Sequence, residues 1–200
     1  MTTNATNSNP SVAEYVVQRL AELGIKHAFG VAGDFTFPID DAIEANNRLS
    51  WVVCNNELTA AYSADGYARI HGAAILTTTY NVGELIALCG VMGSKAERLP
   101  VFHLVGAPSM RLARTGRHMH HAFGDGDLAQ FRGLSEASAG ASAYLTPENA
   151  IAETERVICE ALSKRQPGYI QIPQDYALMP VVGEPIRGPG EGADFLQQRP

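Results

Sequence analysis

The sequence has no excess of positive charge and no long apolar run. Its 200 residues include 15 Lys and Arg against 21 Asp and Glu, and the formal net charge is −6. Basic residues form no stripe along the chain, so we expect no nucleic-acid partner. No segment approaches the roughly 20 apolar residues of a membrane-spanning helix, so we expect no membrane partner either.

Cysteine is scarce. The three cysteines, Cys54, Cys89 and Cys159, are odd in number and far apart, and they form no Cys-x-x-Cys pair or His/Cys metal spacing. Residues 1–10 are polar and lack the apolar centre of a signal peptide. These absences predict free thiols in a reducing, cytoplasmic location and no metal site in this chain.

Short apolar segments alternate with helical patterns. Strands are predicted at residues 27–31, 50–54, 73–79, 101–105 and 168–172, and helices include 57–69, 82–96 and 146–164. Alternation of about six strands with helices predicts an α/β domain, in which helices cover both faces of a parallel six-stranded sheet, as in flavodoxin-like folds. No Gly-x-Gly-x-x-Gly fingerprint or P-loop follows the first strand, so a nucleotide cofactor gains no support.

The predicted domain covers residues 11–182. Residues 1–10 are expected to form a disordered tail. Residues 183–200 are rich in Gly and Pro and are expected to form a linker or a second disordered tail. Ligands of parallel α/β sheets bind beyond the carboxyl ends of the strands. The loops after Val31, Cys54, Thr79 and Val105 are therefore the first place to look for a site.

Glu57 follows the second predicted strand and stands near the start of a helix. On spacing alone, the better interpretation is a first-turn carboxylate that the helix dipole favours. The functional interpretation is a partly buried acid that hydrogen-bonds a ligand nitrogen.

Two histidines, His120 and His121, lie in a loop before a Gly-Asp-Gly-Asp run. They fit a solvated polar loop, but they also fit acid/base work, because histidine titrates near neutral pH. Adjacent loop residues rarely direct both side chains at one ion, which weakens a metal interpretation. Gly33 and Asp34 fit an ordinary turn, and Asn81 fits a helix N-cap.

Taken together, several segments resemble one family, the thiamine-diphosphate-dependent pyruvate and indolepyruvate decarboxylases. The segments are residues 30–35, 56–69, 82–85, 100–109 and 120–127. The Asn-Glu-Leu to Asp-Gly-Tyr-Ala-Arg run is common to many thiamine-diphosphate enzymes. The His pair followed by Gly-Asp-Gly-Asp narrows the resemblance to the decarboxylases. Order and spacing agree from about residue 12 to residue 180, which corresponds to the family's N-terminal, pyrimidine-binding domain.

The resemblance implies roles for individual residues. Glu57 matches the glutamate that hydrogen-bonds N1′ of the cofactor's aminopyrimidine and favours the imino form that deprotonates C2 of the thiazolium. Asp34, His120 and His121 match the acid/base cluster that handles protons on the bound intermediate. Cofactor contacts are also implied for Gly33, Asn81 and Val82.

Departures from the family pattern concern residue 32, residues 80 and 81, and length. Ala32 replaces a proline that usually precedes the Gly-Asp turn, and Tyr80 and Asn81 stand where relatives often have other residues. These changes leave the substrate preference open. Family members are more than twice as long, and their C-terminal domain carries the motif that holds Mg²⁺ and the diphosphate. The run at 124–127 looks like that motif but belongs to the His-pair loop. The expected cofactors are thus thiamine diphosphate and Mg²⁺, and their binding site is expected to be completed by a domain that this chain lacks.

These observations leave several interpretations open. The chain is expected to be the pyrimidine-binding half of a non-oxidative 2-oxo acid decarboxylase that yields an aldehyde and carbon dioxide. It would be inactive alone, would act with a diphosphate-binding domain, and would form a homo-oligomer, as the resemblance implies. The alternative is a truncated or degenerate non-catalytic module that binds a partner subunit. A related acyl or phosphonopyruvate decarboxylase is a third interpretation.

Overall fold

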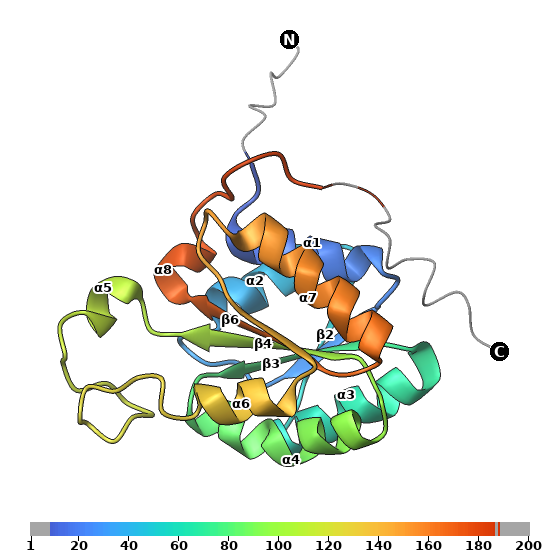
Figure 1. Ribbon diagram of the computed structural model, residues 1–200, viewed down its shortest axis with the longest axis horizontal. Helices are drawn as coiled ribbons and strands as arrows, with labels where there is room; N and C mark the ends of the chain where they lie inside the picture. The colour runs from blue at the N-terminus through green and yellow to red at the C-terminus, as the bar shows by residue number, and fades with distance from the viewer. Residues whose placement is uncertain (1–8, 187, 189–200) are drawn as a thin grey trace, which may run out of the picture.

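The computed structural model describes residues 9–186 and residue 188, and within them the chain forms one layered α/β domain (Figure 1). The strands are β1 His27–Gly30, β2 Ser50–Val53, β3 Ala74–Thr79, β4 Val101–Ala107, β5 Ala141–Tyr144 and β6 Gly168–Pro173. These strands are all parallel and pair in the order β2-β1-β3-β4-β6-β5. The predicted parallel six-stranded sheet is confirmed.

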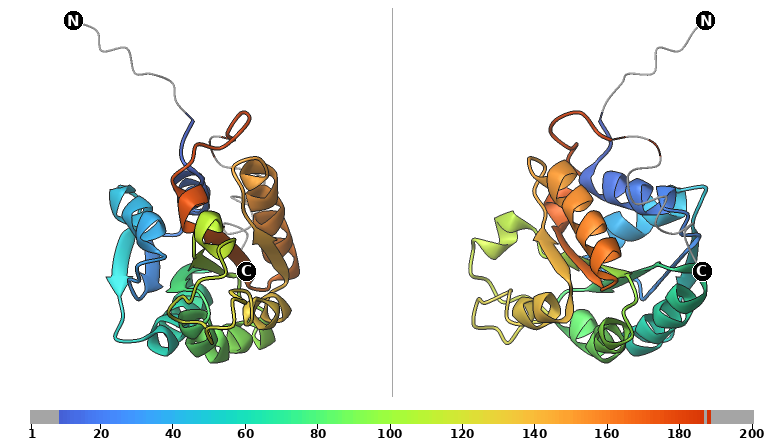
Figure 2. Two further views of the ribbon diagram at one scale, coloured as in Figure 1. Left: turned by 90° about the vertical axis from the view of Figure 1, so that its left-hand side faces the viewer. Right: turned by 45° about the vertical axis from the view of Figure 1, so that its right-hand side comes forward.

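Helices cover both faces of the sheet. They are α1 Val12–Glu22, α2 Phe37–Ala45, α3 Glu57–His71, α4 Val82–Ala96, α5 Met110–Ala113, α6 Arg132–Ser138, α7 Ala150–Lys164 and α8 Gln174–Ala177. Figures 1 and 2 show α1, α2 and α7 on one face and α3, α4 and α6 on the other. None of the helices in the described part of the chain is both long and apolar enough to cross a membrane.

Each face of the sheet has its own apolar core. The larger core joins α1, α2 and α7 to the sheet through fully buried side chains such as Leu20, Ile43 and Val157. The second core lies under α3 and α4, where a Cβ added at Gly90 would stand 2.5 Å from the Cβ of Ala61. Since only glycine allows this approach, the two helices pack with their backbones close together.

Local signals in the sequence agree with the observed helix ends. Ser11 and Glu14 form a capping box at the start of α1, and Gly24 after its end has φ +91°. Asn56 caps α3 by accepting a hydrogen bond from the Thr59 N–H at 2.8 Å. The three cysteines are free thiols, as predicted.

The structure differs from the prediction at strand β5, at the start of α7 and in the short helices α5, α6 and α8, which the sequence does not predict. The sequence does not locate β5, whose four residues Ala141–Tyr144 include two alanines and a serine and give little strand signal. The last long helix begins at Ala150 and not at Thr146. The reason is a turn in which Thr146 and Asn149 exchange backbone-to-side-chain hydrogen bonds of 2.7 and 3.3 Å.

Both ends of the domain meet beside α1. The Asn9 amide donates hydrogen bonds to the carbonyl oxygens of Val181 and Gly183, and Ser11 pairs with Pro180. Most of the predicted tails, residues 1–8, 187 and 189–200, lies outside the described residues.

Gly106 near the end of β4 lies directly beneath the turn that follows β1. A Cβ built on Gly106 would stand 2.2 Å from the carbonyl oxygen of Phe35 and 2.7 Å from the Cα of Thr36. Both neighbours are backbone atoms, so no side-chain rotation would relieve the contact. This glycine therefore fixes how closely the turn containing Asp34 approaches the sheet.

Gly106→Ala is expected to lower the free energy of unfolding by roughly 1–3 kcal/mol, because the added methyl group overpacks the contact with the turn. Gly133→Ala is the matched control, since nothing lies within 4 Å of a Cβ at that position of α6. The control should leave stability unchanged or raise it slightly. Urea unfolding of the two variants measures both effects, and an equal response would contradict the assigned role of Gly106.

Candidate functional site

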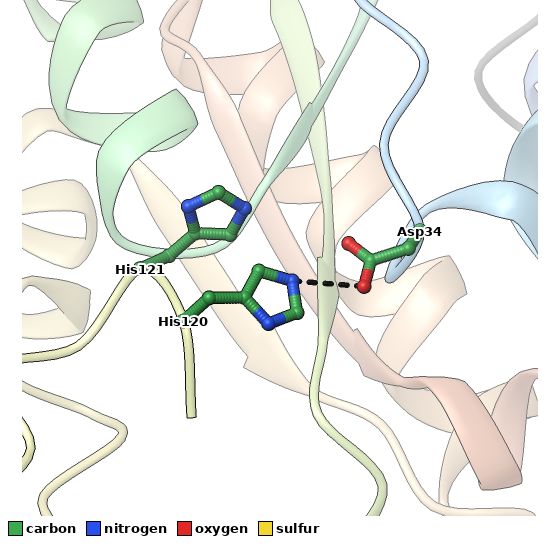
Figure 3. Close-up of side chains that lie close together, drawn as sticks. All are labelled: Asp34, His120 and His121. Atoms are coloured by element: carbon green, nitrogen blue, oxygen red, sulfur yellow. Dashed lines mark ion pairs between the residues drawn. The ribbon is translucent and has the colours of Figure 1, made fainter. Parts of the chain in front are cut away.

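Asp34, His120 and His121 point toward one another at the carboxyl edge of the sheet (Figure 3). The Nε2 atom of His120 lies 2.8 Å from Oδ2 of Asp34, and one ligand atom from each of the three residues lies within 4.8 Å of the others. The side chains of Asp34 and His120 are about half exposed, 48% and 54%. The cluster is thus open to a ligand and can exchange protons with it.

Aromatic residues below the cluster hold His120. Its ring stacks on the ring of Phe35, with centroids 4.8 Å apart and an interplanar angle of 24°. The buried hydroxyl of Tyr80 donates a 2.6 Å hydrogen bond to the His120 carbonyl oxygen. Burial raises the pKa of Tyr80 to about 12, so this hydroxyl keeps its proton at neutral pH.

Two non-glycine residues here have positive φ angles, and a hydrogen bond joins them. His121 has φ +66° and Asn81 has φ +52°. The Asn81 side-chain amide donates a 2.9 Å hydrogen bond to the His121 carbonyl oxygen, while its backbone N–H donates to Glu84 at 2.8 Å. Such conformations are costly and collect at functional sites. Asn81 therefore connects the end of β3 to the His-pair loop, a role beyond the predicted helix cap.

The pKa of His121 lies below its ordinary value. Burial is the largest cause, and the neighbouring His120 adds to it, whereas Asp34 and Glu57 act in the opposite direction. His121 is therefore mainly neutral near pH 7 and can accept a proton. Because the charge of Glu57 acts to raise the pKa of His121, the Glu57 carboxylate lies close enough to the cluster to interact with it electrostatically.

Glu57 is the first residue of α3, as the helix-start interpretation predicts. It is half-buried, and among the described residues none forms a hydrogen bond with its carboxylate. Its Oε1 atom would lie 3.3 Å from a Cβ at Gly83, so the carboxylate lies close to the buried backbone of the first turn of α4. Both interpretations of Glu57 remain compatible with this position.

Two glycines near Glu57 allow the loops to pack closely on Thr79. Gly33 and Gly83 both lie against Thr79, since Cβ atoms built on them would be 3.2 and 2.9 Å from its side chain. Within the described chain, Thr79 Oγ1 and Asn81 Oδ1 are buried without a hydrogen-bond partner. Buried polar atoms without partners are rare and call for an explanation, which a ligand would supply.

The structure brings together all the residues that the sequence singles out. Val82 begins α4 and is 39% exposed beside this edge. His103, which is near the pair in sequence, is instead buried and hydrogen-bonded to Thr78; burial lowers its pKa to about 3. Sequence reasoning missed the supporting residues Phe35 and Tyr80, whose only signal is the aromatic character that any core residue shares.

The expectation that adjacent histidines point apart is not met, since both rings face Asp34. The left-handed backbone at His121 accompanies this arrangement. His120 Nε2 is already paired with the Asp34 carboxylate, which suits proton transfer.

Asp40 of α2 lies buried beneath the Asp34 turn, 6% exposed. The hydroxyl groups of Thr36 and Thr77 donate to its carboxylate at 2.7 and 3.3 Å. The Thr36 oxygen in turn accepts a 3.0 Å hydrogen bond from the Gly33 N–H. Burial outweighs these hydrogen bonds and raises the pKa of Asp40 to about 7. A buried acid that titrates near neutral pH thus supports the turn from below.

Parallel α/β domains bind ligands at the carboxyl edge of the sheet, and this domain carries there an acid, two histidines and a glutamate without a partner among the described residues. The chain belongs to the thiamine pyrophosphate enzymes: the family model for the N-terminal TPP binding domain matches residues 10–130. Thiamine pyrophosphate is another name for thiamine diphosphate, so the predicted membership of the thiamine-diphosphate enzymes is confirmed.

Curated relatives are named alpha-keto-acid decarboxylases. The protein of Mycobacterium avium (strain 104) is 44% identical over 180 residues, which cover 90% of this chain and 32% of the relative. The protein of Mycobacterium leprae (strain TN) is 43% identical over 182 residues, 91% of this chain and 32% of the relative. The chain therefore spans about a third of the length of these relatives.

The buried Asp40 carboxyl makes stability depend on pH. Its pKa is about 7 in the folded chain, against about 4 in an unfolded chain. Between these values the folded state binds more protons, so the contribution of Asp40 to the free energy of unfolding falls as pH rises from about 4 to about 7. Asp40→Asn, which stays neutral, should stabilise the chain more at pH 8 than at pH 5, by on the order of 2 kcal/mol.

Urea unfolding at the two pH values measures this difference. Glu44→Gln, at an exposed position of the same helix, is the control and should show no such dependence. A gain for Asp40→Asn that is equal at both pH values would mean that Asp40 does not titrate in this window.

Proposed function

We propose that this chain is the pyrimidine-binding part of a thiamine-diphosphate-dependent, non-oxidative 2-oxo acid decarboxylase. The observation that carries the proposal is the convergence of Asp34, His120, His121 and Glu57 at one edge of the sheet. Membership of the thiamine pyrophosphate enzymes and the names of the relatives support it. The reaction would convert a 2-oxo acid of the pyruvate or indolepyruvate type into an aldehyde and carbon dioxide.

Glu57 would hold the cofactor's aminopyrimidine. Its half-buried carboxylate lacks a described hydrogen-bond partner and faces the backbone of Gly83, which leaves room for a ring nitrogen to donate to it. Gly33 and Val82 would contact the ring through their backbone, and Asn81 through its unpaired Oδ1. When bound, the cofactor supplies the carbanion and accepts the electrons that carbon dioxide leaves behind.

The Asp34–His120–His121 cluster would move protons. The lowered pKa of His121 keeps its ring neutral, so it can take up a proton near pH 7. Asp34 orients the His120 ring through the 2.8 Å contact, and stacking on Phe35 limits its rotation. The cluster would therefore deliver and remove a proton at a fixed place at this edge of the sheet.

A second part would complete the site. Mg²⁺ and the diphosphate would be bound by a domain outside this chain, since the chain spans only 32% of its M. avium relative. The face of α3 and α4 suits contact with such a part, because apolar side chains are exposed along it. They are Leu58, Tyr62, Val82, Leu85, Ile86 and Met92. An exposed apolar patch of this extent marks an interaction surface.

The test of Glu57 uses a chimera that joins this chain to the part of the M. avium relative that it does not cover. In the chimera, Glu57→Gln should bind cofactor but lose turnover by roughly 10²–10⁴-fold, as for loss of an acid/base group. Exchange of the cofactor's C2 proton with deuterium should also slow. His121→Ala should lose turnover while C2 exchange stays near normal.

The control is Asp41→Asn, an exposed carboxylate of α2, which should leave turnover and exchange unchanged. If the Glu57→Gln chimera exchanges the C2 proton at the wild-type rate, Glu57 has no role in activating the cofactor and is only a carboxylate at the start of a helix. A chimera that folds and binds cofactor but releases no carbon dioxide would favour the non-catalytic module. The chain alone should release none.

The apolar face predicts self-association of the isolated chain. Sedimentation over a concentration series should show a dimer or larger species, and Leu85→Lys should shift it toward monomer, because the charge lies within the exposed face. Val182→Lys, at an exposed apolar residue outside the α3–α4 face, is the control and should leave association unchanged. A wild-type chain that stays monomeric throughout would contradict the proposed surface.

A further inference from the structure

Glu84 lies in the first turn of α4 and is fully buried. The backbone N–H of Asn81 donates to its Oε1 atom at 2.8 Å. The hydroxyl groups of Ser135 and Tyr169 both donate to its Oε2 atom, at 2.7 and 2.9 Å. One carboxylate thus joins the end of β3 to helix α6 and to strand β6.

A buried carboxylate at this place is costly. Burial raises the pKa of Glu84, whereas its hydrogen bonds and the charge of Arg132 act to lower it. Within the described chain no cation forms an ion pair with Glu84, and Arg132 pairs instead with Glu136 at 3.5 Å. Hydrogen bonds from neutral donors only partly offset the loss of hydration of a charged group. The presence of a carboxylate here therefore calls for an explanation other than stability.

The loop between α5 and α6 carries the histidine pair and has few polar attachments. Apart from its junctions with these two helices, residues 114–131 bond to the rest of the described chain through two hydrogen bonds and one ion pair. The hydrogen bonds run from Tyr80 and Asn81, at the end of β3, to the carbonyl oxygens of His120 and His121. The ion pair belongs to His120. Asn81 is thus the hydrogen-bonded attachment of His121.

Glu84 acts on this attachment and on the end of the loop. Asn81 reaches the His121 carbonyl oxygen with a backbone φ of +52°, which few non-glycine residues adopt. The Glu84 carboxylate accepts from the N–H of the same Asn81 and stabilises that conformation. The bond from Ser135 holds α6, where the loop returns to the domain, beside α4 (Figure 1). Both the residue that holds His121 and the end of its loop therefore depend on one carboxylate.

We propose that Glu84 is a positioning residue for His121. Through Asn81 it fixes the place of the His121 carbonyl oxygen, and through Ser135 it fixes where the loop ends. Tyr169 holds the carboxylate itself, because its hydroxyl comes from the sheet. That this placement serves proton transfer rests on the proposed function, whereas the placement itself does not.

Nuclear magnetic resonance of the isotope-labelled 200-residue chain tests the placement without any measurement of activity. Tyr169→Phe and Ser135→Ala each remove one hydroxyl that donates to Glu84. We expect both variants to change the coupling between the amide and α protons of His121, which reports its φ angle. The ring of His121 should also titrate at higher pH, because a loosened loop exposes the ring and burial is the main cause of its lowered pKa. The side-chain amide protons of Asn81 should exchange faster with water.

Each variant has a matched control. Tyr15→Phe removes a buried hydroxyl that donates to Glu155 at 2.9 Å on the other face of the sheet. Ser138→Ala removes a buried hydroxyl of α6 that donates to a carbonyl oxygen of its own helix. Both controls lose a buried hydrogen bond, yet they should leave the signals of His121 and Asn81 unchanged.

Substitutions of Glu84 separate its hydrogen bonds from its bulk. In Glu84→Gln the amide oxygen can still accept from the Asn81 N–H, and the NH₂ group can donate to the two hydroxyl oxygens. The His121 signals should therefore stay near those of the wild type. Glu84→Met keeps a side chain of similar length without these polar atoms and should change the His121 signals more than either hydroxyl variant.

Two results would overturn the proposal. In the first, the His121 signals change no more in Tyr169→Phe and Ser135→Ala than in the matched controls, and this comparison decides even where Glu84→Met does not fold. In the second, Glu84→Gln changes the signals as much as Glu84→Met does. Neither result depends on cofactor binding or turnover, so the proposed decarboxylase function can fail while the positioning role stands.

Discussion

The carboxyl edge of the sheet depends on close approach of backbone to backbone. Gly106 lies under the carbonyl of Phe35, and Gly33 and Gly83 lie against the side chain of Thr79 from two sides. A side chain at any of these three positions would push a loop away from the sheet. Because these glycines keep the loops close to the sheet, Nε2 of His120 lies 2.8 Å from Oδ2 of Asp34, although 86 positions in sequence separate the two residues. The positions of the site's side chains therefore depend on close packing at these glycines.

Strain and burial at this edge are balanced by contacts that reach across the chain. His121 and Asn81 both have positive φ angles, and the hydrogen bond between them joins the end of β3 to the His-pair loop. Below the Asp34 turn, the Asp40 carboxyl is kept from water and linked to Gly33 through Thr36. Features of this kind lower the stability of a fold and persist where the surrounding structure holds them. Their concentration within one small region is physical support for a functional role.

Some of this architecture follows from sequence and some does not. Runs such as residues 74–79 predict buried strands because their side chains are apolar or β-branched, and Glu57 is placed correctly because Asn56 signals a helix start. The sequence does not predict strand β5, because its small residues give no apolar or β-branched pattern. The sequence does not predict the orientation of His120 and His121 either. It depends on Tyr80 and Asn81, which are 40 residues away in sequence, and no local propensity encodes such contacts.

The edge as it stands is chemically incomplete, and this is the strongest physical argument about its use. Within the described chain, Thr79 Oγ1 and Asn81 Oδ1 are buried without partners, and the Glu57 carboxylate beside them has none. A domain that evolved only to be stable would satisfy or replace such groups, since an apolar residue costs less than an unpaired polar one. Next to this edge, apolar side chains of α3 and α4 are exposed to solvent, which is also unfavourable for an isolated domain. Unmet polar atoms and uncovered apolar surface at one place are what a domain presents when a ligand and a partner complete it.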